Sequence, residues 1–355
     1  MLKLLLKKLL PSSLQSLITQ WRISFKLFLS AKCSRFKFTS GLYYLFFDQQ
    51  FYREQQATLA GKIAYSENNG LAEKSSALLR RNIHRLEKGL IMKPRKAVFA
   101  QGYITETVNC FSACLHRGGI DEQELKWAQD VLTQYFVIVE NTDIISNAKY
   151  SFNALPVVDE KGISAIPYTF DERIQANVQA NDLHDLFKQR RSVRWFKKQH
   201  VDKATIAQAV EMAAQAPSAC NRQPFQFYTF TDPEKASKIA SIPMGTKGFA
   251  QNVPALIVVV GDLSAYPKER DRHVIYIDGG LVAMQLMLAF ETLGLSTCPI
   301  NWPDMEVYER KMDQALNLEK HQRPIMLMAI GYGDDSGGIP FSQKKSTKQL
   351  IKDMD

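Results

Sequence analysis

Short apolar runs alternate with helix-like segments over the second half of this 355-residue chain. Residues 225–231 alternate between apolar and polar side chains, while residues 255–261 and 325–331 are almost continuously apolar, and both patterns are typical of strands. Residues 203–216 and 275–293 have the length and periodicity of helices, and the second is apolar enough to be buried. Helices that alternate with short strands cover the faces of a sheet. The pattern therefore predicts an α/β (α+β) sandwich around one sheet.

The first half of the chain has a different character. Residues 51–155 show helical periodicity with few breakers, whereas the stretch between Pro156 and Pro167 is irregular. The predicted organisation is an arm over residues 1–50, a mainly helical domain over 51–155, a linker over 156–180 and a sheet-containing domain over 181–355.

The positive charge is concentrated in the arm. The whole chain carries a formal charge of +9, and residues 1–50 hold eight Lys and Arg side chains against Asp48 alone. That leaves +2 for the remaining residues, so the body of the protein lacks the charge of a nucleic-acid-binding surface, and we expect no nucleic-acid partner.

The five cysteines are odd in number and scattered, which favours reduced thiols in the cytoplasm. Cys110 and Cys114 are four positions apart and would share one face of a helix. No Cys or His partner follows them at the spacing of a zinc site, so we expect no metal.

The arm contains a basic amphipathic segment. After Ser12 and Ser13, which fit a helix cap, apolar residues recur at helical spacing. The arm has no uninterrupted apolar stretch as long as a secretory or membrane-spanning segment. The recurring residues are Leu14, Leu17, Ile18, Trp21, Phe25, Phe28 and Leu29. Two interpretations stay open: residues 1–40 bind an anionic membrane surface, or the stripe is buried against the protein itself or a partner. We therefore expect a cytoplasmic protein, with peripheral membrane contact under the first interpretation.

Two short segments carry chemistry. Residues 190–194 (RRSVR) place three guanidinium groups and a hydroxyl within five positions, which suits a phosphate because several donors converge on its oxygens. Residues 217–224 (PSACNRQP) form a loop bracketed by prolines, rich in side chains that make turns. Each segment alone is ambiguous, since a basic surface run and an ordinary turn look the same.

The order of these segments, with three later ones, resembles the FMN-dependent nitroreductase family over residues 181–355. The family's R-x-S-x-R/K element matches residues 190–194, and its P-S-x-x-N-x-Q-P loop matches residues 217–224, so that the two serines are 26 positions apart. Residues 278–295 resemble its long central helix, and residues 299–301 resemble the segment that passes the flavin ring. Residues 329–333 with Lys344 resemble its C-terminal phosphate-contacting stretch.

The resemblance implies a mixed central sheet and a homodimer with FMN at its interface. By similarity, Arg190, Arg191, Ser192 and Lys344 hold the phosphate and ribityl chain, and Arg194 lies near N1 and O2 of the ring, where a cation favours reduction. The loop of the partner subunit covers the ring. The full set of predicted cofactor-binding residues is Arg190, Arg191, Ser192, Arg194, Pro217, Ser218, Ala219, Asn221, Gln223, Pro299, Ile300, Asn301 and Lys344.

The implied activity is ping-pong hydride transfer from NADH or NADPH to a small electron-poor acceptor such as a nitroaromatic or a quinone. No catalytic side chain is needed, because the cofactor carries the chemistry. Two alternatives stay open: a specialised flavoenzyme, for example one for reductive dehalogenation or a biosynthetic intermediate, and a non-catalytic flavin-binding accessory protein. Asn301 and Trp302 depart from the family's usual small or acidic pair, so Trp302 is expected to narrow the pocket. Arg222 stands where a small residue is usual.

Two further features leave alternatives. Residues 80–89 form a basic run in which Arg81 and Arg85 align on a helix that ends at Gly89. This run is either a solvated face neutralised by Glu87 or a site for a phosphate or an acidic saccharide, and it resembles extensions of nitroreductase-like proteins found with bacterial surface-polysaccharide genes. Cys220 is either a redox thiol or, by the more common use of such residues, a small turn residue.

Overall fold

The structure is a computed structural model that describes residues 11–68, 70–71, 74–158 and 164–354. It separates into two compact units, Met1–Gln55 and Gln56–Asp355, and each is described by itself. The first ten residues of the predicted arm lie outside the described residues.

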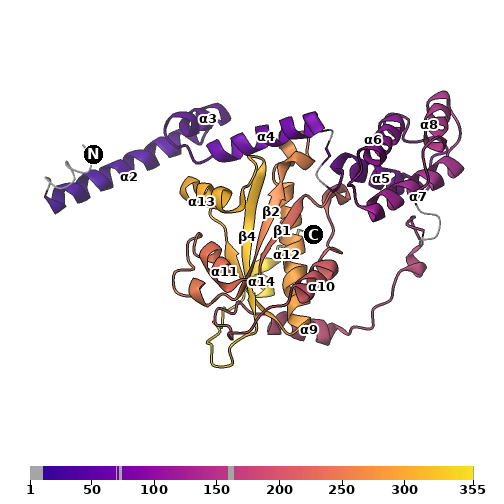
Figure 1. Cartoon of the computed structure of the whole chain (residues 1–355). Helices are drawn as coiled ribbons and strands as arrows, with labels where there is room; N and C mark the ends of the chain where they lie inside the picture. The colour runs from indigo at the N-terminus through magenta and orange to yellow at the C-terminus, as the bar shows by residue number, and fades with distance from the viewer. Residues whose placement is uncertain (1–10, 69, 72–73, 159–163, 355) are drawn as a thin grey trace. The chain divides into compact units, whose positions relative to one another are not determined.

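The helices and strands alternate along the second half as the periodicity indicates (Figure 1). The helices of the described residues are α2 (Ser12–Cys33), α3 (Lys37–Phe46), α4 (Tyr52–Asn68), α5 (Ala77–Leu90), α6 (Ile104–Arg117), α7 (Glu122–Ile138), α8 (Asp143–Asn153), α9 (Ala180–Gln189), α10 (Lys203–Ala213), α11 (Pro233–Ala240), α12 (Val274–Thr292), α13 (Glu306–Leu316) and α14 (Thr347–Leu350). The strands are β1 (Phe225–Phe230), β2 (Ala255–Asp262), β3 (Ser296–Asn301) and β4 (Gln322–Gly331), and a 3-10 turn, η2, spans Ala219–Asn221.

The sheet has the strand order β1-β2-β4-β3, and its strands pair antiparallel. Its parallel element is an isolated bridge between Ser192 and Thr297, which attaches the segment after α9 to the edge strand β3. The pairing places this segment beside the end of α12, because β3 begins four residues after that helix.

Helices cover both faces of the sheet, so successive residues of the central strand β2 are buried on opposite sides. Ala255, Ile257 and Val259 join one apolar cluster with α10 and α12, whereas Leu256 and Val258 join the other with α11 and α13. A strand buried on both faces reads as a continuous apolar run, which explains the pattern of residues 255–261.

The central helix α12 closes on the sheet through Gly279. A Cβ atom at this position would lie 2.4 Å from Cδ1 of Ile325 on β4, so a larger residue would require the Ile325 side chain to move. The stretch Glu269–Thr292 is long and apolar enough to cross a membrane, yet half of it is buried within the structure. It packs against both the sheet and α10, so it is the core helix of the sandwich (Figure 1).

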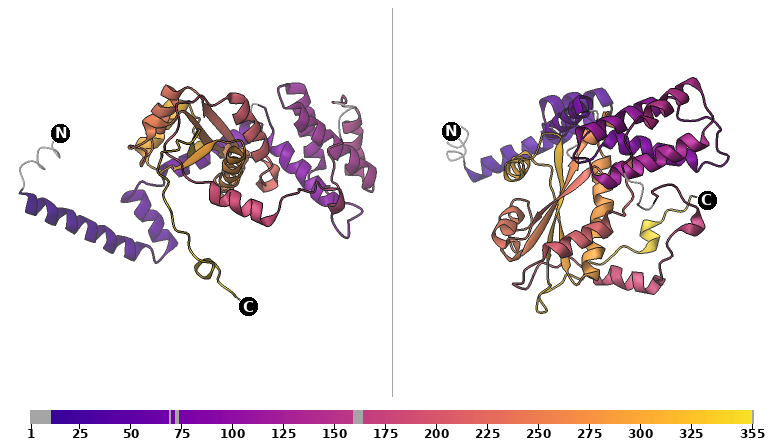
Figure 2. Two further views of the ribbon diagram at one scale, coloured as in Figure 1. Left: turned by 90° about the horizontal axis from the view of Figure 1, so that it is seen from below. Right: turned by 45° about the vertical axis from the view of Figure 1, so that its right-hand side comes forward.

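Helices α5 to α8 form a bundle with an apolar cluster of its own (Figure 2). Its largest side chains with almost no exposure include Phe111 and Tyr135. Helix α4, which precedes the bundle, lies directly on the 3-10 turn after β2, since a Cβ atom on Gly61 would come within 2.7 Å of the backbone of Leu263.

Two expected helix ends are wrong. Gly89 lies inside α5, which runs to Leu90 and is capped by Ile91, and a Cβ atom on Gly89 would lie 2.3 Å from the ring of Phe99. This glycine therefore serves close packing and not a left-handed cap. In the arm, Pro11 is the residue before α2, and Ser12 already belongs to the helix.

Candidate functional site

The Arg/Ser segment, residues 190–194, follows α9 directly and is held along the edge of β3. The N–H group of Val193 donates a 3.0 Å hydrogen bond to the carbonyl oxygen of Thr297, and the carbonyl oxygen of Arg194 accepts a 3.0 Å hydrogen bond from Asn252. The arginines and Ser192 are half-buried. The backbone is thus fixed while the side chains keep access to solvent.

Two buried polar atoms near this segment have no hydrogen-bond partner, namely Nε of Arg190 and Oγ1 of Thr297. Buried polar atoms in proteins are nearly always satisfied, so both atoms have unused capacity to bind a polar group. The two atoms lie on the two segments that the Ser192–Thr297 bridge joins, Arg190 on the Arg/Ser segment and Thr297 on β3.

Burial and the nearby arginines act in opposite directions on the pKa values of two ionisable groups around the segment. Burial raises the pKa of the Glu291 carboxyl, while Gln189 and Arg190 act in the opposite direction. Burial also raises the pKa of the Cys298 thiol, against the cations Arg194 and Arg190. Cys298 is therefore an inert core residue with its neutral form favoured.

The second predicted segment, the loop of residues 217–224, contains three residues with left-handed backbone angles, Cys220, Asn221 and Gln223. Its hydrogen bonds converge on Ser218. The Ser218 hydroxyl donates to Oδ2 of Asp278 at 2.7 Å and accepts from the N–H group of Gln223 at 2.7 Å, and the N–H group of Ala219 donates to the same carboxylate oxygen at 3.0 Å. The loop is thereby attached to α12.

The side chain of Gln223 is engaged at both ends. Its Nε2 donates to the carbonyl oxygen of Ala214 at 3.0 Å, and its Oε1 accepts from Arg80 of α5 at 3.0 Å. The hydroxyl of Ser218 is likewise used within the protein. What this loop offers a ligand is therefore its backbone edge and the side chain of Asn221. Cys220 is half-exposed in a left-handed turn.

The third segment, residues 299–301, is the end of β3. Ile300 is buried in the core and Asn301 is exposed at the strand end. The next residue, Trp302, was expected to narrow the pocket, and this is wrong. It is buried in the cluster with α11 and α13, and its indole N–H donates to Glu309 at 2.5 Å.

Trp302 takes part in a buried charged network on the face of the sheet that α11 and α13 cover. Nη2 of Arg323 lies 3.3 Å from Oε1 of Glu309 and 2.9 Å from Oδ1 of Asp304. Arg323 and Glu309 are almost fully buried. Burial opposes the charge of Arg323, but Glu309 and Asp304 outweigh it and raise its pKa.

The last predicted residue, Lys344, lies in an extended, exposed C-terminal tail (Figure 2). The tail starts beside the Arg/Ser segment, where the N–H group of Asp334 donates to the carbonyl oxygen of Trp195 at 3.0 Å and Lys197 pairs with Asp335 at 2.9 Å. Lys344 itself follows further along the tail.

The basic run on α5 is partly engaged in contacts within the bundle, and its two interpretations stay predictions. Arg85 stacks its guanidinium 3.6 Å above the ring of Tyr103, and Glu87 binds both His84 and the indole N–H of Trp127. The residue of this run that contacts the loop of residues 217–224 is Arg80, and these contacts were not predicted from the sequence.

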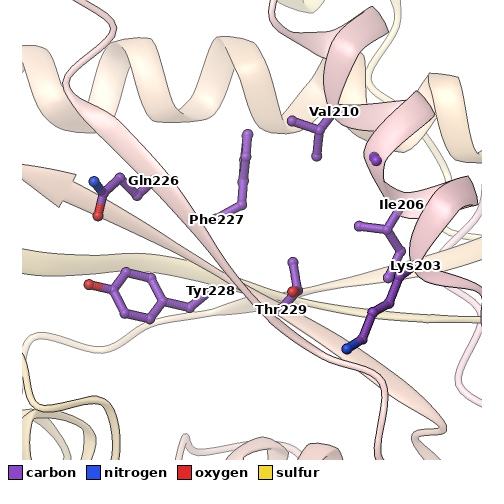
Figure 3. Close-up of a pocket in the computed structure, with 8 residues that line it drawn as sticks. Lys203, Ile206, Val210, Gln226, Phe227, Tyr228 and Thr229 are labelled. Carbon is purple, nitrogen blue, oxygen red and sulfur yellow. The ribbon is translucent and has the colours of Figure 1, made fainter. Parts of the chain in front are cut away.

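A hollow of about 550 Å³ lies elsewhere, between α10 and the edge strand β1. Ile206, Val210 and Phe227 lie around it (Figure 3). It contains none of the predicted cofactor-binding residues, so the hollow and the predicted site are different places.

Within one copy, the two main segments lie at opposite ends of α12. Asp278 holds the loop, and Glu291, thirteen positions later, accepts a 3.4 Å hydrogen bond from Gln189, the neighbour of Arg190. Thirteen residues of helix span about 20 Å. Asp278 and Glu291 are the two charged residues of this otherwise uncharged helix, and their isolation in an apolar segment was the signal available in the sequence.

Comparison with known proteins identifies the class. The model of the nitroreductase family matches residues 187–246 and 241–332. YdgI of Bacillus subtilis, which bears the name of an NAD(P)H nitroreductase, is 27% identical over 197 residues, covering 45% of this chain and 92% of that protein. Iodotyrosine deiodinase 1 of Mus musculus is 22% identical over 227 residues, covering 54% of this chain and 77% of that protein.

A solved nitroreductase family protein from Streptococcus pneumoniae is 23% identical, with a TM-score of 0.42, and the match covers 48% of this chain and 99% of that one. The family match identifies residues 187–332 as similar to the nitroreductase family. The helices before α9 lie outside the matched residues.

Proposed function

We propose that the protein is an FMN-dependent NAD(P)H oxidoreductase that works as a homodimer and reduces a small electron-poor acceptor, such as a nitroaromatic or a quinone. The observation that carries this proposal is the distribution of the site along α12. The Arg/Ser segment and the Ser218 loop are attached to opposite ends of this helix, so one copy does not close both around the same part of a nucleotide.

A second copy resolves this separation. If two α12 helices cross antiparallel about a twofold axis, the Asp278 end of one meets the Glu291 end of the other. The helix offers a suitable face, since Ile277, Leu281 and Met284 are exposed, at 58%, 43% and 38%, and recur at helical spacing. Burial of this apolar face would stabilise the dimer and complete two equivalent sites.

The residues present fit FMN. Arg190, Arg191 and Ser192 would hold its phosphate, with the unpartnered Nε of Arg190 and Oγ1 of Thr297 as donors that lack an acceptor within the protein. Arg194 would place a cation beside the ring, and the backbone of the Ser218 loop would lie against it. When bound, FMN supplies the hydride and electron transfer chemistry, and the protein contributes binding, orientation and charge.

A second candidate reaction is reductive dehalogenation, in which the electron acceptor is a halogenated compound. It is supported by the iodotyrosine deiodinases among the relatives, of which the mouse protein matches 54% of this chain. The same predicted site would serve both chemistries, since both need an electron-poor substrate to receive electrons from a reduced flavin.

The test is a visible spectrum of the purified protein, followed by anaerobic addition of NADH or NADPH and then of one acceptor at a time. We expect flavin absorbance, bleaching by a nicotinamide, and recovery of colour with a nitroaromatic or menadione. Recovery only with 3-iodotyrosine, with release of iodide, would favour dehalogenation. A protein that takes up no FMN would refute both enzymatic proposals and leave an accessory role.

We also propose that the protein is cytoplasmic and that its arm touches an anionic membrane surface. Helix α2 has no buried residue and no acidic residue, and it exposes Trp21 and Phe28 at 67% and 60%. Arg22, Lys26 and Lys32 lie on the same helix, a combination that suits a headgroup region.

Sedimentation with vesicles tests the membrane proposal. The full chain should bind vesicles that contain phosphatidylserine and should bind phosphatidylcholine vesicles much less. Substitution W21D with F25D should abolish binding, whereas V137D, at an exposed apolar position on α7, should leave it unchanged. Equal binding of all three proteins would exclude α2 as the contact.

A further inference from the structure

The loop of residues 217–224 has a backbone that needs support. Cys220, Asn221 and Gln223 have φ angles of 54°, 52° and 48°. Left-handed angles are costly for residues other than glycine, and they persist only where surrounding contacts impose them. Asp278 imposes the first half of the loop through Ser218 and Ala219. In the second half, the N–H group and Nε2 of Gln223 are bonded to Ser218 and Ala214, whereas the carbonyl oxygen of Asn221 and Oε1 of Gln223 need another source of support.

That source is Arg80 on α5. Its Nε donates a 2.7 Å hydrogen bond to the carbonyl oxygen of Asn221, and its Nη2 donates a 3.0 Å hydrogen bond to Oε1 of Gln223. A guanidinium holds its donors in a rigid planar fork, so these two bonds fix the carbonyl and the side chain relative to each other.

The guanidinium is itself held from behind. Nη1 of Arg80 donates to Oε2 of Glu124 on α7 at 2.9 Å, and its Cζ lies 5.4 Å from the ring centre of Trp127. Glu124 is buried and also accepts from the hydroxyl of Ser75 and the N–H group of Ser76, at 2.7 and 2.8 Å. Glu124 is therefore held by its own hydrogen bonds, Glu124 orients Arg80, and Arg80 orients Asn221.

A second contact joins the same loop to the region of α4. The guanidinium carbon of Arg222 lies 4.9 Å from the ring centre of Tyr266, and Tyr266 is buried in a small cluster with Leu263, Ile275 and Ala57 of α4. Arg222 thus gives this loop an additional attachment.

We infer that Arg80 is a positioning residue for the loop of residues 217–224, which would face the flavin. The helices before α9 would then contribute to the active site through α5 and α7. Through Arg80, helices α5 and α7 hold Asn221 and Gln223 in the left-handed conformation that shapes the backbone edge offered to the ring. This inference rests on the proposed function for its catalytic consequence. The effect on the loop itself is independent of any bound cofactor.

Hydrogen exchange of the flavin-free full-length protein tests the loop directly. The amides of residues 219 and 221–223 are all hydrogen-bonded, so they exchange slowly while the loop holds its shape. In R80A we expect exchange in the peptide over residues 217–225 to accelerate by about tenfold or more. The matched control is R85A on the same helix, whose guanidinium stacks on Tyr103 and which should leave the loop unchanged.

R80K guards against a trivial unfolding effect, because lysine keeps the charge beside Glu124 but lacks the fork. It should accelerate loop exchange to an intermediate extent, while peptides from α6 and α7 remain as protected as in the wild type. Wild-type exchange of the loop in R80A, or acceleration that is equal in the loop and throughout α6 and α7, would overturn the inference.

The catalytic consequence is read in the FMN-loaded protein. R80A should shift the visible flavin spectrum and raise KM for the acceptor by about fivefold or more, with kcat changed less, while R85A matches the wild type. A wild type that binds no FMN would refute the proposed function, yet the exchange experiment would still decide the role of Arg80. Flavin properties of R80A identical to those of R85A would refute the catalytic role.

Discussion

The hydroxyl of Ser218 donates a 2.7 Å hydrogen bond to the carboxylate of Asp278. Asp278 is buried at 2% exposure within an apolar helix, and the same oxygen accepts the N–H group of Ala219. A buried carboxylate that binds a loop in this way determines where the backbone of that loop lies.

Substitution D278A should weaken FMN binding. It leaves the Ser218 hydroxyl and the Ala219 N–H group without their acceptor, and a hydrogen bond to a charged group is worth about 1.5–3 kcal/mol. We expect the Kd for FMN to rise by about 10- to 100-fold in a fluorescence titration. E211Q, at an exposed position on α10, is the control, and equal affinity in both variants would contradict the prediction.

Substitution L281R should disrupt the proposed dimer. Leu281 lies in the exposed apolar face of α12, and in the proposed dimer two such residues would face each other across a twofold axis, where like charges repel. We expect light scattering after gel filtration to report a monomer that has lost FMN. V137R provides an exposed apolar control outside α12. A dimeric L281R protein with full FMN content would exclude this face.

Substitution R323M should destabilise the fold. It removes the guanidinium that lies 3.3 Å from Oε1 of Glu309, which is 0% exposed, and removal of one member of a buried pair costs about 3–5 kcal/mol. The free energy of unfolding in urea should fall by that amount. The double variant R323M/E309Q should recover part of it, because glutamine still accepts from Trp302 and carries no charge.

The exposed pair Glu306–Arg310, 3.1 Å apart, gives a matched comparison for this network. R310A should cost less than about 1 kcal/mol, since exposed pairs contribute little. Equal losses in R310A and R323M would show that the buried network is not special.

Glu291 makes stability depend on pH. Burial raises its pKa, so the folded protein retains a proton that the unfolded chain releases above its ordinary carboxyl pKa of about 4.3. Its contribution to stability is therefore fully present below about pH 4 and is lost as the pH rises through the raised pKa. E291Q removes this dependence, so its Tm should exceed that of the wild type increasingly from pH 4 to pH 8. A constant difference across this range would contradict the assignment.

Much of the sandwich was predictable because periodicity is a local property. The predicted helix at residues 275–293 and the structural α12, Val274–Thr292, differ by one residue at each end, and the predicted strand at 255–261 lacks only Asp262 of β2. The Arg/Ser segment and the Ser218 loop were found by their order along the chain. The roles of their individual residues in cofactor binding stay predictions.

Other features depend on partners that are distant in sequence. The sequence by itself determined the elements, the basic arm and the two motif segments, since each is written in neighbouring residues. Only the tertiary structure decided that Gly89 closes on Phe99, that Trp302 is buried against Glu309, and that Arg80 reaches Asn221 across 141 positions. These contacts arise from packing between elements, because a side chain's partner is chosen by the space and the unsatisfied polar groups that the fold brings beside it.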